Sequence, residues 1–135
     1  MSANKNVMLK LPSNPRNVCK VESYLKRIVE KYRLSPEVYG DILVSLTEAV
    51  NNAIIHGNCE DESKLVKIHL QKEKDRLAVR VSDEGCGFDY RNLPDPTSPE
   101  NITKVGGRGV FLMHQLSENI EFRDNGRTVE MRFKI

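Results

Sequence analysis

Apolar and polar residues alternate along five short segments of the chain, and this two-residue period predicts β-strands. A turn near Lys74-Asp75 joins the second and third segments, and the turn Asp124-Asn125-Gly126 joins the last two into a hairpin. The predicted strands are residues 7–11, 66–70, 77–81, 120–122 and 129–135.

Three other segments carry apolar residues at the spacing of a helix, and they cover residues 18–33, 35–56 and 109–117. The second helix has clear end signals: Ser35 is a good N-cap, Pro36 suits the first helical position, and Gly57 suits the stop. Each predicted strand has only one apolar face. We therefore expect a two-layer α/β (α+β) fold, with helices on one face of the sheet and water on the other.

Residues 88–105 have no clear periodicity and contain Pro94, Pro96 and Pro99. Loops longer than about 12–15 residues in a compact domain are usually lids, binding loops or disordered segments. We interpret this one as a functional lid, because glycine-containing motifs flank it on both sides.

Composition narrows the class of protein. The 135 residues suit one domain, and 21 basic against 19 acidic residues leave a net charge of +2, too little for general binding to nucleic acid. No apolar run approaches the roughly 20 residues of a membrane span, and the first six residues lack a signal-peptide pattern. The three cysteines are far apart without a CxxC pair, which favours a reducing cytoplasm over a disulfide framework or zinc site.

The first patch with candidate chemistry lies on the second helix. Glu48 and Asn52 are one turn apart, about 40° from each other around the helix axis. Apolar and polar residues share their face, a mixture typical of a pocket wall, although a solvated polar stripe explains this helix equally well. These neighbours are Asp41, Val44, Ser45 and Ile55.

The second patch follows the third strand, where Asp83, Gly85 and Gly87 stand at alternate positions. A carboxylate at a strand end can accept a hydrogen bond from the exocyclic amine of a base. The two glycines permit positive φ and close approach of the backbone to a ligand. Taken alone, however, the segment is better explained as an ordinary turn.

The third patch is Gly106-Gly107-Arg108-Gly109, which opens the last helix. The free N–H groups at a helix start, with the helix dipole behind them, favour phosphate, and Lys104 or Arg108 would add positive charge. The Gly-Lys-Ser/Thr ending of a Walker A loop is absent. Phosphate binding here requires another nucleotide architecture.

Together, residues 48–58 (EAVNNAIIHGN), 83–88 (DEGCGF) and 106–113 (GGRGVFLM) resemble the asparagine box and two glycine boxes of the GHKL ATPase/kinase superfamily. Within it, the chain is most similar to the small bacterial anti-sigma-factor serine/threonine kinases, the RsbW-like group. The resemblance covers nearly the whole chain. It implies a single Bergerat-type domain over residues 1–135, with a mixed, mostly antiparallel sheet and an ATP lid at about 88–108.

The resemblance also implies the roles of the matching residues. Asn52 would be the Mg²⁺ ligand and Glu48 the general base. Asp83 would receive the adenine amine of ATP or ADP. The other nucleotide-binding residues would be Gly85 and Gly87 at the base, and Lys104, Gly107, Arg108 and Gly109 at the phosphates. Thr128 on the last strand is left out, because alternation with Val129 and Met131 turns it away from the core.

The expected function is that of a cytoplasmic ATP-dependent serine/threonine protein kinase. By resemblance it would phosphorylate a small anti-sigma-factor antagonist and hold a sigma factor, as a monomer or a homodimer, without contact to nucleic acid or membrane. The alternatives are a nucleotide-gated protein-binding module with little or no kinase activity, and an interaction domain without nucleotide. The presence of Glu48 beside Asn52 favours the enzyme, since a pure binder needs the metal ligand more than the base.

Overall fold

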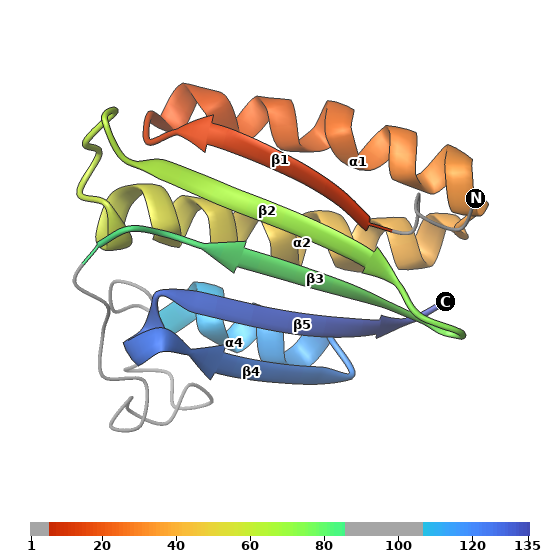
Figure 1. The fold of residues 1–135 in the computed structure, drawn as a ribbon. Coiled ribbons are helices and arrows are strands. Elements are labelled where there is room, and N and C mark those ends of the chain that lie inside the picture. Colours follow the sequence, from red (N-terminus) through yellow and green to blue (C-terminus); the bar gives the residue numbers. More distant parts are fainter. Residues whose placement is uncertain (1–5, 86–106) are drawn as a thin grey trace.

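The computed structural model describes residues 6–85 and 107–135, with the side chains of 8–85 and 109–135. Five strands form one sheet in the order β1-β2-β3-β5-β4 (Figure 1). Each pair of neighbouring strands is antiparallel, so the mostly antiparallel sheet that we expected has no parallel pair among the described strands. The strands are β1 (Asn6–Pro12), β2 (Leu65–Lys72), β3 (Arg76–Ser82), β4 (Asn119–Arg123) and β5 (Thr128–Lys134).

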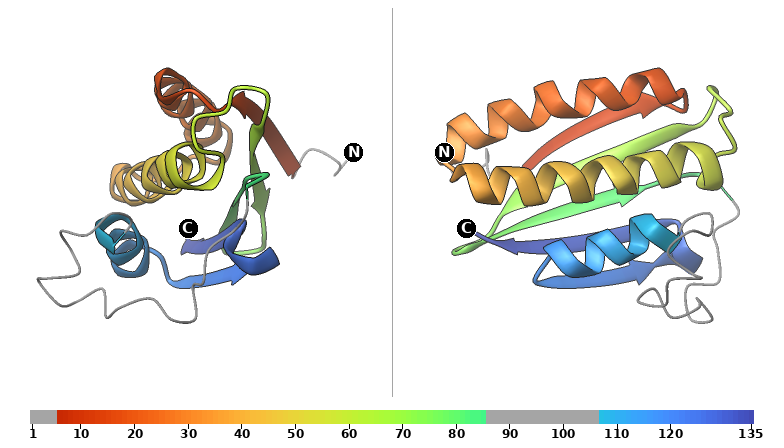
Figure 2. Two further views of the ribbon diagram at one scale, coloured as in Figure 1. Left: turned by 90° about the vertical axis from the view of Figure 1, so that its left-hand side faces the viewer. Right: turned by 180° about the vertical axis from the view of Figure 1, so that it is seen from behind.

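The helices α1, α2 and α4 cover one face of this sheet, and its other face is open (Figure 2). This confirms the two-layer arrangement predicted from the single apolar face of each strand. The helices are α1 (Cys19–Tyr32), α2 (Pro36–Asn52) and α4 (Gly107–Leu116), with short 3₁₀ turns η2 (Pro15–Val18) and η5 (Asp124–Gly126).

The second helix starts as its sequence predicts and ends differently. The Ser35 hydroxyl accepts a hydrogen bond from the Val38 amide, and Pro36 is the first helical residue. The regular helix stops at Asn52, and the chain continues through a wider π-helical turn, η3 (Ala53–Gly57), to the predicted end. Single π-helical turns of this kind occur frequently at functional sites.

The core lies between the two layers. Aliphatic side chains of α1 and α2 pack on the inward side chains of the three central strands, and the largest of them are completely or almost completely shielded from water. They include Leu25, Ile42, Leu46, Ile54, Ile68, Leu70, Leu77 and Met131. This packing fixes α2 across the sheet and so determines where the end of α2 stands relative to the strand ends.

The open face of the sheet carries charged side chains. Glu130 on β5 is only 3% exposed and forms ion pairs with Arg80, Arg123 and Arg132. Burial alone would raise the pKa of Glu130, but the hydrogen bond from Arg80 and the charges of the three arginines outweigh it and lower that pKa. This network stabilises the pairing of β5 with both its neighbours.

Candidate functional site

The three sequence patches meet at one end of the molecule. The π-helical end of α2, the segment after β3, the start of β5 and the start of α4 all lie at that end (Figures 1 and 2). Helices α2 and α4 run side by side on the same face of the sheet (Figure 2). Gly87 and Lys104, together with the predicted lid segment 88–105, lie outside the described residues.

Glu48 and Asn52 of α2 face the first turn of α4. A β-carbon placed on Gly109 would stand 3.0 Å from Asn52 Nδ2 and 3.1 Å from Glu48 Oε2. Gly109 is buried in this contact. A larger residue at 109 would press on the ends of these two polar side chains and force them to shift. Gly107 and Arg108 form the preceding helical residues, so their backbone N–H groups belong to the same first turn.

Asp83 stands beside the end of α2, and two glycines make this possible. A β-carbon on Gly57 would lie 2.4 Å from Asp83 Oδ2, and one on Gly85 would lie 1.7 Å from the carbonyl oxygen of Gly57. Neither glycine has positive φ. Gly85 therefore does not use the positive φ that a glycine permits, and the close approach of its backbone is to Gly57. Gly57 likewise serves close packing instead of a left-handed helix cap.

The Asp83 carboxyl group is half-buried, and burial raises its pKa. The Gly85 N–H, which donates to Asp83 Oδ1 at 2.9 Å, opposes this effect, as do the charges of Arg127 and Lys64. A carboxylate with reduced hydration and one oxygen already bonded is well suited to accept a directional hydrogen bond from a ligand.

Asn58, which follows the π-helical turn, joins three segments around Asp83. Its Oδ1 accepts from the Glu84 amide at 2.8 Å, and its Nδ2 donates to Ser13 Oγ at 2.8 Å and to the Leu65 carbonyl at 3.2 Å. Its side chain is buried with all three bonds. We did not predict this role, because no local pattern shows that an asparagine after a helix reaches two strands.

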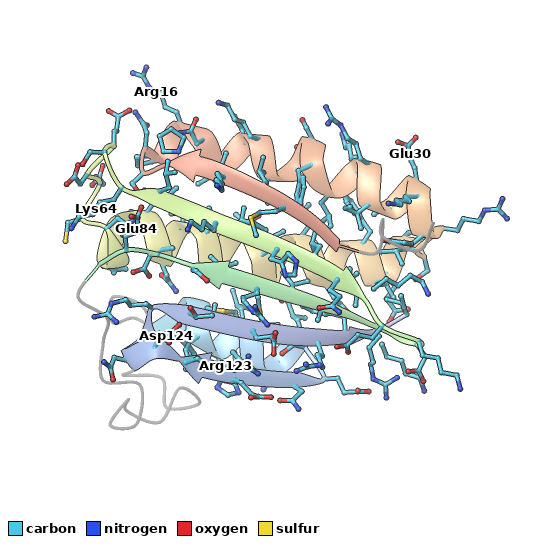
Figure 3. All side chains as sticks on the ribbon, in the orientation of Figure 1. Arg16, Glu30, Lys64, Glu84, Arg123 and Asp124 are labelled. Atoms are coloured by element: carbon cyan, nitrogen blue, oxygen red, sulfur yellow. The ribbon has the colours of Figure 1, made fainter. Side chains whose placement is uncertain are left out.

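The segment after β3 is tied to the start of β2 as well. The Glu84 carboxylate accepts a hydrogen bond from the Leu65 amide. Glu84, Lys64 and Asp124 lie at the same end of the sheet (Figure 3). The turn at residues 83–85 is therefore held from the α2 side and from the β2 side, and this fixes the position of Asp83.

Arg127 is a second site residue that sequence reasoning missed. Its Nε–H donates to the Gly85 carbonyl at 2.7 Å, and its own carbonyl accepts from the Asp83 amide at 2.9 Å. The only signal in the sequence was an arginine just after the predicted 124–126 turn. That position gives no hint of a contact with a segment more than 40 residues earlier.

Thr128 follows the alternation that excluded it from the site. The β3–β5 register continues without a bulge to the pair Ser82 and Thr128, so Thr128 lies on the face opposite Val129. Its hydroxyl contacts Ser82 Oγ and Asp124 Oδ2, both at 3.1 Å. These contacts account for its burial without a ligand.

The flanks of the Glu48–Asn52 stripe have mixed character. Ser45 is fully buried, and its hydroxyl has no hydrogen-bond partner among the described residues, whereas Val44 and Ile55 remain 41% and 38% exposed. The contact with Gly109 shows that α4 covers part of the stripe, so it is not simply a solvated helix face. The exposed aliphatic side chains leave apolar surface beside the two polar groups.

Acidic, histidine and cysteine side chains do not form a cluster of three able to hold a metal ion anywhere in the described residues. The oxygens of Glu48 and Asn52 are nevertheless hard ligands of the kind that Mg²⁺ accepts, and Mg²⁺ commonly takes its remaining ligands from water and phosphate. In the part of the chain that the structure describes, no helix is long and apolar enough to cross a membrane.

The sequence matches the histidine kinase-like ATPase domain family over residues 11–133. The chain therefore belongs to this family, and the superfamily expected from the three motifs is confirmed. A Bacillus licheniformis protein named serine-protein kinase RsbW is 30% identical over 132 residues, which cover 93% of this chain and 82% of the relative. The Listeria innocua protein of the same name is 27% identical over 132 residues, covering 93% and 84%.

A solved structure supports the fold. The crystal structure of the RsbU and RsbW domains of a Mycobacterium tuberculosis protein superposes with a TM-score of 0.67 at 14% identity. The match covers 95% of this chain and 31% of that longer chain. The Bergerat-type sandwich implied by the sequence motifs is thus confirmed, and the relatives are the serine kinases that the motifs resembled.

Proposed function

We propose that this chain binds ATP at the end of α2 and α4 and transfers its γ-phosphate to a serine or threonine of a small partner protein. Residues 1–135 act as one nucleotide-binding domain in this proposal. The family and the names of its relatives support the reaction class. The convergence of Glu48, Asn52, Asp83 and the start of α4 supports the position of the site.

The observation that carries the proposal is the contact of Gly109 with Glu48 and Asn52. It brings the N-terminal turn of a helix, where free backbone N–H groups and the helix dipole favour phosphate, against a carboxylate and an amide. A structural helix pair has no need of such a combination. Phosphoryl transfer requires all three: donors for the phosphates, a metal ligand and a base.

Asn52 holds Mg²⁺ through its amide oxygen in this proposal, and Glu48, one turn earlier, accepts the proton of the attacking hydroxyl. When bound, Mg²⁺ neutralises charge on the transferring phosphate. The N–H groups of residues 107–109 and the Arg108 side chain bind phosphate oxygens. Asp83 accepts the exocyclic amine of adenine, and Gly85 keeps the turn close to Gly57 so that the carboxylate stays in place.

The proposed protein partner is an anti-sigma-factor antagonist, with a sigma factor as the second partner, by analogy with the anti-sigma-factor kinases that the motifs resemble. The proposed location is the cytoplasm, which agrees with the free, exposed thiols of Cys19 and Cys59. We also propose that two copies of this chain associate as a homodimer.

The test uses γ-labelled ATP, Mg²⁺ and a purified antagonist protein from the same organism. We expect label on a serine or threonine of the antagonist with the unmodified chain, and a loss of at least about a hundredfold in rate with Glu48→Gln. Glu37→Gln is the matched control, because Glu37 is an exposed glutamate in the first turn of the same helix. Nucleotide binding without any transfer would instead support a nucleotide-gated binding module.

A further inference from the structure

Arg127 holds the turn that carries Asp83 through both its side chain and its backbone. The Nε–H of Arg127 donates to the Gly85 carbonyl at 2.7 Å, and its Nη1 donates to the Asp124 carbonyl at 3.3 Å. Its backbone carbonyl accepts from the Asp83 amide at 2.9 Å. The guanidinium thus links η5 to the turn at residues 83–85, and the main chain extends the β3–β5 pairing past Ser82.

These contacts leave one oxygen of Asp83 in a defined position. Oδ1 accepts the Gly85 N–H, and Oδ2 lies beside the α-carbon of Gly57, where a β-carbon would come within 2.4 Å. Any side chain at residue 57 would collide with Oδ2, so this contact requires a glycine. The position of Oδ2 therefore depends on the turn, and the turn depends on Arg127 on the β5 side and on Asn58 on the α2 side.

The charge of Arg127 acts on the same carboxyl group. Burial raises the pKa of Asp83, and the positive charges of Arg127 and Lys64 counteract it. Lys64 precedes β2, and the neighbouring Glu84 carboxylate is bonded to the Leu65 amide. Arg127 is the one cation of this set that also forms a hydrogen bond to the turn.

We propose that Arg127 is a positioning residue for purine selection, which holds the residue 83–85 turn so that the Asp83 carboxylate is presented as an acceptor for an exocyclic amine. The proposal deepens the proposed function and rests on it. Adenine presents an amine at C6, whereas guanine presents a carbonyl oxygen at the same position, which an ionised carboxylate repels. Loss of Arg127 weakens the acceptor and with it the preference for adenine.

The test is a titration of the full chain with ATP and with GTP between pH 5 and pH 8, for the unmodified chain, Arg127→Gln and Arg127→Lys. We expect Arg127→Gln to lower ATP affinity roughly tenfold at pH 7, the effect of losing one hydrogen bond from a charged donor. Arg127→Gln should also lower the ratio of ATP affinity to GTP affinity. The pH below which ATP affinity is lost moves upward, because the Asp83 pKa rises when a nearby positive charge is removed.

Arg127→Lys keeps the positive charge but loses the planar guanidinium that donates to the Gly85 carbonyl. It therefore lowers ATP affinity, while the pH below which ATP affinity is lost stays near that of the unmodified chain. The matched control is Arg123→Gln, since Arg123 ion-pairs on the open face of the sheet with Glu121 and Glu130. This control should bind both nucleotides as the unmodified chain does.

Two results would overturn the inference. In the first, Arg127→Gln binds ATP like the unmodified chain. In the second, it loses affinity for ATP and GTP equally, and the pH below which ATP affinity is lost does not change, which indicates only a structural role. Failure of the proposed function looks different. In that case the unmodified chain binds no ATP, or binds it regardless of Asp83→Asn, whatever the result at Arg127.

Discussion

Gly57 lies against the carboxylate of Asp83 so closely that a β-carbon at residue 57 would stand 2.4 Å from Oδ2. The end of α2 and the turn after β3 therefore form one packed unit. Glu48 and Asn52 stand on the same helix. The proposed general base and the proposed metal ligand therefore stand at fixed positions relative to Asp83, the proposed acceptor for adenine. A nucleotide that spans both ends of the site requires this.

Gly57→Ala tests this contact. The added methyl group must displace the Asp83 carboxylate or the end of α2, and overpacking of this kind costs about 1–3 kcal/mol of unfolding free energy. We expect a lower midpoint in urea denaturation and a loss of ATP affinity. Gly40→Ala is the control, because a β-carbon at Gly40 meets nothing within 4 Å. It should raise stability by about 0.5–1 kcal/mol and leave binding unchanged.

Gly109→Ala distinguishes the phosphate-binding end of the site from the adenine-binding end. A β-carbon there would press on the ends of the Glu48 and Asn52 side chains, which must give way by a few tenths of an ångström beside the phosphate-facing helix start. We expect weaker binding of ATP, with the affinity for adenosine unchanged. Equal losses for ATP and adenosine in calorimetric titrations would show that the start of α4 does not contact phosphate.

Asp83→Asn should separate binding from stability. The folded-state pKa of Asp83 is raised, chiefly by burial, so the ionised carboxylate is less favourable in the folded chain than in the unfolded one. Its contribution to stability therefore falls as pH rises through the interval between the two pKa values. Asparagine keeps an oxygen for the Gly85 N–H and carries no charge. We expect Asp83→Asn to be at least as stable as the unmodified chain at pH 7 in thermal denaturation, and a lower Tm would contradict this.

Glu130→Gln probes the network on the open face of the sheet. Here the folded-state pKa is lowered, so the stabilisation is present above the ordinary glutamate pKa of about 4.3 and is lost as pH falls below it. We expect a loss of about 1–2 kcal/mol at pH 7, discounted because the three arginines are partly exposed. The unfolding free energy of the variant, measured by urea denaturation, should also fall less steeply as the pH is lowered below about 4.3.

Glu121→Gln is the control for this network. Glu121 pairs with Arg123 and Arg132 but is about half exposed, so its removal should change stability by less than about 0.5 kcal/mol. Equal effects of Glu121→Gln and Glu130→Gln would show that burial of Glu130 adds nothing to its ion pairs.

The sequence predicted the elements and their layers because each depends on local periodicity. Alternation located all five strands within a few residues, and Ser35-Pro36 located the start of α2. The motif order predicted the family, and Glu48, Asn52 and Gly109 do lie together. These features depend on spacing along the chain, which can be read without coordinates.

The features that were missed depend on contacts between distant segments. Gly57 and Gly85 are glycines because their backbones touch each other and Asp83, and Arg127 reaches Gly85 across β3 and β5. Asn58 bonds to Ser13, Leu65 and Glu84. Because most of these partners lie far apart in the sequence, no periodicity or cap signal indicates them.

The measurement that tests the nucleotide site most directly is calorimetric titration of the purified chain with ATP and ADP, with and without Mg²⁺, beside Asp83→Asn. We predict binding that is strengthened by Mg²⁺, and a loss of at least about tenfold in affinity in the variant, because an amide cannot reproduce the charge and both acceptors of a carboxylate. No detectable binding to the folded chain, or equal binding by Asp83→Asn, would contradict the site proposed at the end of α2 and α4.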